Sequence, residues 1–133
     1  MTQEEKQLLF KDLCARLSCG VKILDIPANV VGDLFLVSTT DTVEYEPADE
    51  TNDDTGYQTL YNIKPYLRPM SSMTEEENLK LEDMEFEMAH LKFTTYTHEC
   101  MILDYLYSRH LDVRGLIPMG LALEAPEDMY KTE

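Results

Sequence analysis

Apolar residues near the start of the chain recur at helical spacing. Leu9, Leu13 and Leu17 fall four residues apart, with Phe10 and Cys14 beside them. Because a helix has 3.6 residues per turn, positions three and four apart share one face. The pattern therefore predicts an amphipathic helix whose apolar stripe packs on the core.

The residues that flank this stripe set the ends of the predicted helix. Thr2 and Glu5 have the spacing of a capping box, in which each side chain accepts a backbone N–H bond from the other residue. Gly20 can adopt the left-handed conformation that often ends a helix. The sequence therefore predicts a helix over residues 3–18.

After Gly20 the apolar positions form short, β-branched runs separated by turn residues, which is typical of strands. One long interval contains no apolar side chain larger than Ala and Pro and is predicted to be a loop. The predicted strands are residues 21–26, 30–38, 42–46 and 57–63, and the loop is 47–56. Three or four short antiparallel strands predict a small curled sheet, for which an SH3-like barrel is one possible form.

Helical spacing returns in the second half of the chain. Residues 64–73 contain two prolines and two serines, which predicts compact turns. Thr74 and Glu77 then repeat the capping-box spacing at the start of a predicted helix over 75–91. The apolar positions of this helix that fall on one face are Leu81, Met84, Met88 and Leu91.

The C-terminal third predicts two more helices. Thr94, Thr95 or Thr97 can cap a helix that runs to about Arg109. Asp112 can cap a short last helix through residues 113–117. The expected fold class is α+β: an N-terminal helix, an antiparallel sheet of three to four strands, then two to three helices. No linker or internal repeat divides the chain, so we expect one domain over 1–133.

Acidic residues are concentrated in two windows. Asp and Glu exceed Lys and Arg by 26 to 11, and the net charge is -15. Residues 44–56 contain six acids and no base, and residues 74–90 contain seven acids and one Lys. Such blocks produce local negative fields that repel nucleic acid and attract basic surfaces.

This charge pattern predicts a non-enzymatic interaction module that binds a protein with a basic surface. The candidate contact residues are Glu44, Glu46, Asp49, Glu50, Asp53, Asp54, Glu82 and Glu85. An alternative is a nucleic-acid mimic that blocks a DNA- or RNA-binding protein, which requires the two windows to lie side by side as rows of carboxylates. Direct binding of nucleic acid is not expected, because no basic stripe is present.

Tyrosines form a second candidate surface. Tyr57, Tyr61 and Tyr66 cluster in the sequence, with Lys64 and Arg68 nearby. Tyr and Arg are enriched among the residues that dominate binding energy at protein interfaces. The alternative, which we favour, is a Tyr-rich strand packed under the helices with its hydroxyl groups at the rim.

The sequence contains no motif that predicts catalysis, a metal site or a cofactor. The acidic loop lacks the Gly and Glu positions of an EF-hand, and the three histidines lack zinc-ligand spacing. A further alternative is a small hydrolase in which His98, Glu99, Asp104 and His110 converge. The simpler interpretation places the histidines at surfaces or helix ends, with His110 stabilised near a helix C-terminus.

Cysteine usage and hydropathy predict a cytoplasmic protein. Cys14, Cys19 and Cys100 form no CxxC pair and no even set, so we expect reduced thiols that act as small buried apolar residues. No apolar run approaches the ~20 residues of a membrane span, and the N-terminus lacks the features of a secretory signal.

Three parts of the chain resemble a known family. They are residues 64–76, residues 12–17 with 20–22, and residues 114–117 with 120–126, which together make 33 residues. These segments resemble a family of small uncharacterised proteins from gut Bacteroidales and their phages. The resemblance implies a standalone small protein in a bacterial or phage-infected cytoplasm, and it implies no activity.

Overall fold

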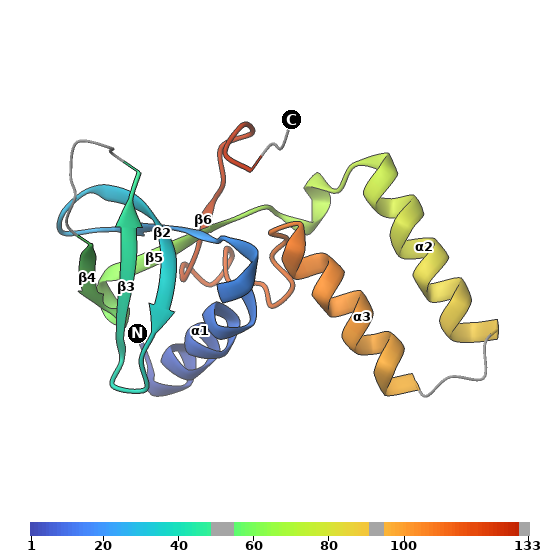
Figure 1. The fold of residues 1–133 in the computed structure, drawn as a ribbon, viewed down its shortest axis with the longest axis horizontal. Coiled ribbons are helices and arrows are strands. Elements are labelled where there is room, and N and C mark those ends of the chain that lie inside the picture. The colour runs from blue at the N-terminus through green and yellow to red at the C-terminus, as the bar shows by residue number, and fades with distance from the viewer. Residues whose placement is uncertain (49–54, 91–94, 131–133) are drawn as a thin grey trace.

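The computed structural model describes residues 1–48, 55–90 and 95–130 of the chain. One helix packs on a β-sheet at one end of the longest axis, and two further helices lie at the other end (Figure 1). We call the first helix, the sheet and their connections the body, and the two later helices the arm. The predicted α+β class is confirmed.

The N-terminal helix α1 spans Gln3–Arg16, close to the predicted range. Its capping box is present: the Glu5 N–H donates to the Thr2 hydroxyl at 3.1 Å, and the Thr2 N–H donates to the Glu5 carboxylate at 2.9 Å. A 3-10 turn follows, and Gly20 has a φ of 76°, the left-handed conformation that the sequence predicts.

The sheet contains six strands rather than the three to four predicted, in the order β4-β3-β2-β1-β5-β6. All neighbours are antiparallel except β5 and β6, which are parallel. The strand order does not show an SH3-like barrel. The strands are β1 Lys22–Asp25, β2 Val30–Val37, β3 Thr42–Pro47, β4 Gly56–Thr59, β5 Ile63–Leu67 and β6 Leu123–Glu124.

Two strand predictions were wrong in their boundaries. The predicted strand over 57–63 is divided by a 3-10 turn at Leu60–Asn62, so β4 ends at Thr59. The predicted turn over 64–73 contains β5, because Pro65 suggested a break in a segment that pairs with β1. Strand β6 pairs only with Tyr66 and Leu67, just beyond that proline.

The hydrophobic core lies between α1 and the sheet. Leu9 and Leu13 of α1 are fully buried and pack with side chains from the strands and from the C-terminal segment. The same helix face also buries Asp12 and Arg16, whose Nε donates to the Asp12 carboxylate at 2.7 Å. Cys14 is exposed, so its predicted burial was wrong.

Tyr45 of β3 links four strands through its ring and its hydroxyl group. The hydroxyl donates to the Asp25 carboxylate of β1 at 2.6 Å. A Cβ atom at Gly32 of β2 or at Gly56 of β4 would lie 2.4 or 2.1 Å from the ring. Both positions therefore need glycine, because a larger residue would displace the Tyr45 side chain.

The arm consists of α2, Glu75–His90, and α3, Thr95–Ser108. The last predicted helix, over 113–117, was wrong. Asp112 still accepts N–H bonds from Leu116 and Ile117 at 2.8 and 3.0 Å, but the described residues there form turns. Gly115 has a φ of 73°, which a right-handed helix cannot contain.

Candidate functional site

The arm extends away from the body, and α2 packs on α3 along one side only (Figure 1). On that inner side Leu81 and Met84 are half-buried, as the apolar pattern predicts, and Glu77 is buried. The opposite side of α2 faces away from α3. That side contains exposed acidic and apolar side chains close together.

Two large apolar side chains lie on the outward side of α2. Leu79 is 56% exposed and Phe86 is 62% exposed. Residues seven apart are two turns apart on the same helix face, so about 10 Å separates them along the axis. This pair could be recognised in the sequence, because both positions lie outside the apolar stripe that contains Leu81 and Met84.

Carboxylates surround this apolar pair. Glu75, Glu82 and Asp83 lie three or four residues from Leu79 or Phe86, which makes them neighbours on the helix surface. We call these five residues the α2 outer face. The exposed acids of the whole helix are Glu75, Glu76, Glu82, Asp83, Glu85 and Glu87, against the exposed Lys80. The predicted residues Glu82 and Glu85 are therefore exposed in a strongly negative surface.

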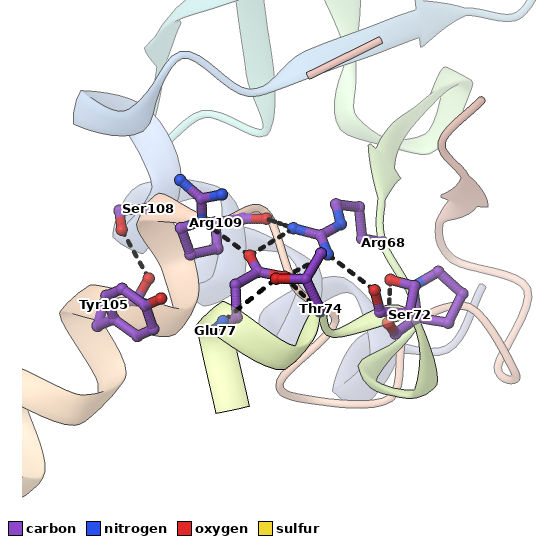
Figure 2. A network of polar contacts seen from close by, with 8 residues as sticks. Arg68, Ser72, Thr74, Glu77, Tyr105, Ser108 and Arg109 are labelled. Carbon is purple, nitrogen blue, oxygen red and sulfur yellow. Dashed lines mark hydrogen bonds and ion pairs between the residues drawn. The ribbon is translucent and has the colours of Figure 1, made fainter. Parts of the chain in front are cut away.

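A polar clamp fixes the base of α2 (Figure 2). Arg68 donates to both carboxylate oxygens of Glu77 at 2.7 Å, and Arg109 Nε donates to one of them at 2.7 Å. Thr74 completes a capping box, since its N–H donates to the Glu77 carboxylate at 2.9 Å and its hydroxyl accepts the Glu77 N–H at 3.2 Å. We call Arg68, Thr74, Glu77 and Arg109 the clamp.

The clamp keeps Glu77 ionised although its side chain is only 2% exposed. Hydrogen bonds from Arg68 hold the pKa of Glu77 far below its usual value, and bonds from Arg109 and the Thr74 backbone lower it further against the effect of burial. The same pairing raises the pKa of Arg68. Arg68 was predicted to contact a partner protein. Its charge is instead paired with Glu77 inside the fold.

The first acidic window is only partly described. Asp49, Glu50, Asp53 and Asp54 lie outside the described residues. Glu44 and Glu46 alternate with the buried Val43 and Tyr45, so they lie on the sheet face turned away from the core. The strand register places Glu44 between Leu36 of β2 and Tyr57 of β4.

The described parts of the two acidic windows lie at opposite ends of the molecule. Strands β3 and β4 are at the left of Figure 1, and α2 is at the right. The described carboxylates of the two windows therefore do not form one continuous row. A nucleic-acid mimic built from both windows needs such a row.

The predicted tyrosine surface is not assembled. Strand β4, with Tyr57, and strand β5, with Tyr66, are separated in the sheet by β3, β2 and β1. Tyr57 and Tyr61 are 64% and 49% exposed, so they do not pack under the helices either. Tyr61 instead lies near α1, where the Lys6 ammonium is 5.7 Å from its ring centre.

The histidines and acids of the hydrolase alternative do not converge. His98 is ten residues before Ser108, the end of α3, which is about 15 Å along the helix, and His110 lies beyond that end. His98 is buried, whereas Glu99 and Asp104 of the same helix are exposed. Within 1–48, 55–90 and 95–130, no group of three His, Cys, Asp or Glu side chains is placed to hold a metal ion.

Two predictions about single residues were wrong. His110 was expected to be stabilised as a cation, but burial and four nearby cations lower its pKa to about 4. Its ring stacks on Tyr130, with ring centres 3.7 Å apart and planes 11° from parallel. Cys100 was expected to be buried, but it is exposed on α3, and Cys19 is half-buried.

Comparison of the whole chain with known protein families, with curated proteins and with solved structures finds no match. Among the described helices, none combines the length and the apolar character that crossing a bilayer requires.

Proposed function

We propose that this protein is a non-enzymatic binding module whose α2 outer face docks on a partner protein that presents an apolar groove with a basic rim. The observation that carries the proposal is the exposed pair Leu79 and Phe86 among carboxylates on one helix. A helix that inserts apolar side chains two turns apart is a common mode of recognition. Large apolar anchors inside a charged rim are typical of such interfaces.

Charge favours a basic partner over a second copy of this chain. The α2 surface has six exposed acids and one exposed Lys, so two copies would bring like charges together. A basic rim would instead speed association, and the effect would weaken as salt shortens the Debye length to about 3 Å at 1 M. As the resemblance of three sequence segments implies, we expect the partner in a bacterial or phage-infected cytoplasm.

The clamp supports the proposal because it orients the binding helix. Glu77 lies at the start of α2 and is bound by two arginines that directly follow β5 and α3. A helix held in its binding conformation loses less entropy on binding than one that must first be ordered. The α2 outer face is thus presented on a fixed element.

A comparison of matched variants tests the proposal. The protein and the double variant Leu79→Ala/Phe86→Ala are used to capture partners from a Bacteroidales lysate, and Kd is then measured with the purified partner. The control is Ile26→Ala/Met119→Ala, which removes two exposed apolar side chains of the body that are each 44% exposed. At positions 79 and 86, alanine preserves the helix propensity of α2.

We expect the α2 variant to weaken binding about 30-fold or more, as loss of an anchor worth ~2 kcal/mol requires, and the control to leave Kd unchanged. Affinity should also fall with salt. Capture that is equal for both variants contradicts the proposal. So does a partner whose affinity is independent of salt, or a concentration-dependent dimer of this chain in sedimentation experiments.

A further inference from the structure

A cavity of about 570 Å³ lies at the base of the arm. Arg68, Thr74 and Arg109 line it from the clamp, and Glu124, Glu127 and Tyr130 line it from the C-terminal segment. Two prolines, one serine and one alanine complete the lining. The volume falls within the range of about 300–1,000 Å³ that is usual for small-molecule sites.

Arg109 lines this cavity, and in the described part of the chain a portion of its guanidinium group is unpaired. Its Nε donates to Glu77, but within the described residues no hydrogen bond or ion pair engages its two terminal nitrogens. Figure 2 shows these nitrogens pointing away from Glu77. The side chain is 45% exposed. A guanidinium fork of this kind matches the two oxygens of a carboxylate.

Four cationic side chains lie near His110, which is next to the cavity. His110 stacks on Tyr130, which lines the cavity, and its pKa is lowered to about 4 by burial and by the charges of Arg16, Arg68, Arg109 and Lys22. His110 is therefore neutral near pH 7. Arg16, Lys22 and Arg68 are already paired with carboxylates, so a ligand carboxylate would pair with the terminal nitrogens of Arg109, which no described residue engages.

The C-terminal segment supplies the opposite charge. Glu124 and Glu127 are exposed, and neither forms an ion pair within residues 1–48, 55–90 and 95–130. A simple anion would be attracted by Arg109 but repelled by these two carboxylates. A ligand with an anionic end and a cationic end would satisfy both groups.

We propose that this cavity binds a small zwitterion of the size of an amino acid or a dipeptide. Its carboxylate would lie on the terminal nitrogens of Arg109, its ammonium group would lie near Glu124 and Glu127, and its side chain would contact the Tyr130 ring. This site is separate from the α2 outer face, so either proposal can fail without the other.

The first test uses ligands that differ only in their charged ends. The twenty common amino acids and dialanine are screened by NMR chemical-shift changes, and dialanine is compared with N-acetyl-dialanine and dialanine amide. We expect one or more zwitterions to bind with a Kd below about 10 mM, and either blocked end to weaken dialanine at least tenfold. No binding by any zwitterion, or equal binding by the blocked forms, overturns the proposal.

The second test uses variants of the cavity. Glu124→Gln/Glu127→Gln changes only exposed side chains and should weaken zwitterion binding at least tenfold. Arg109→Gln should also weaken zwitterion binding, but it alters the clamp as well. The result for Glu124→Gln/Glu127→Gln is therefore the decisive test of the proposal. Glu46→Gln/Glu87→Gln, which changes exposed acids elsewhere, is the matched control and should bind normally. Unchanged affinity in Glu124→Gln/Glu127→Gln overturns the proposal.

Discussion

The body and helix α2 of the arm are held in place by different forces. The core of the body is apolar and combines α1, the strands and the C-terminal segment, with Leu9, Leu13 and Ile23 fully buried. No described side chain of α2 or α3 belongs to that core cluster, although α3 buries Leu106 and Tyr107 next to the body. Among the described side chains of α2, the buried one is Glu77, a charged residue.

The difference shows that, in a small protein, the interactions that fix the position of a helix can be separate from those that stabilise the fold. Apolar burial is roughly proportional to area and has no preferred direction, so it stabilises the body as a unit. The clamp is directional, because Arg68 and Arg109 fix Glu77 through charged hydrogen bonds. We therefore expect changes in the clamp to loosen the arm and changes in the core to unfold the body.

The largest expected effect comes from the core. Leu13→Ala should lower the free energy of unfolding by ~2–5 kcal/mol, because it removes a fully buried side chain and leaves a cavity. Leu79→Ala is the control and should change it by less than about 0.5 kcal/mol, since Leu79 is exposed. Urea titrations measure both. A Leu13→Ala protein as stable as the wild type would contradict the α1 packing.

The clamp should have a smaller and local effect. Glu77→Gln should cost ~1–3 kcal/mol, because it removes a buried carboxylate that accepts three bonds from arginines. Hydrogen exchange should become faster in α2 and stay unchanged in β1 and β2. The exposed Glu87→Gln is the control. Equal acceleration in the arm and the strands would show that the two regions are not separable.

Acid should reproduce part of the clamp effect. The pKa of Glu77 is lowered below its ordinary value of 4.5, so its contribution is complete above that pH and is lost as the pH falls toward the folded-state pKa. The difference in Tm between the wild type and Glu77→Gln should therefore narrow from pH 6 to pH 3. Scanning calorimetry measures it. A difference that is constant over this range would exclude the ionised clamp as its source.

The smallest expected effect concerns the α2 surface. Glu82→Gln should raise the free energy of unfolding by ~0.2–0.5 kcal/mol, because Glu82 and Glu85 are like charges three residues apart on the exposed side of the helix. Added salt should raise the Tm of the wild type for the same reason. A Tm that falls as salt is added would mean that these carboxylates are already neutralised by specific pairs.

The structure was predicted most accurately from the sequence where the interacting residues lie close together along the chain. Both capping boxes, at Thr2 and at Thr74, were confirmed because their partners are three residues apart. Pro65 concealed β5, since proline usually interrupts a strand. The predicted last helix does not form although Asp112 accepts N–H bonds as a helix cap would. The left-handed conformation of Gly115 is incompatible with a right-handed helix at that position.

The candidate site was only partly predictable for the same reason. The acidic character of α2 and the off-stripe positions of Leu79 and Phe86 can be seen in the sequence. The clamp could not be predicted, because Arg109 is 32 residues from Glu77 and no periodicity connects them. The cavity depends on Tyr130 meeting the end of β5 and the end of α3, which only the tertiary fold brings about.

The chain leaves the body and returns to it at adjacent points. The Arg68 N–H donates to the His110 carbonyl, and the Asp112 N–H donates to the Arg68 carbonyl, each at 2.8 Å. Residues 69–109 thus form a long connection whose two ends are hydrogen-bonded to each other. These bonds at its base do not depend on how long the connection is. Adding the same number of turns to α2 and α3 would lengthen the arm without changing the strand order, so its reach can vary while the sheet stays the same.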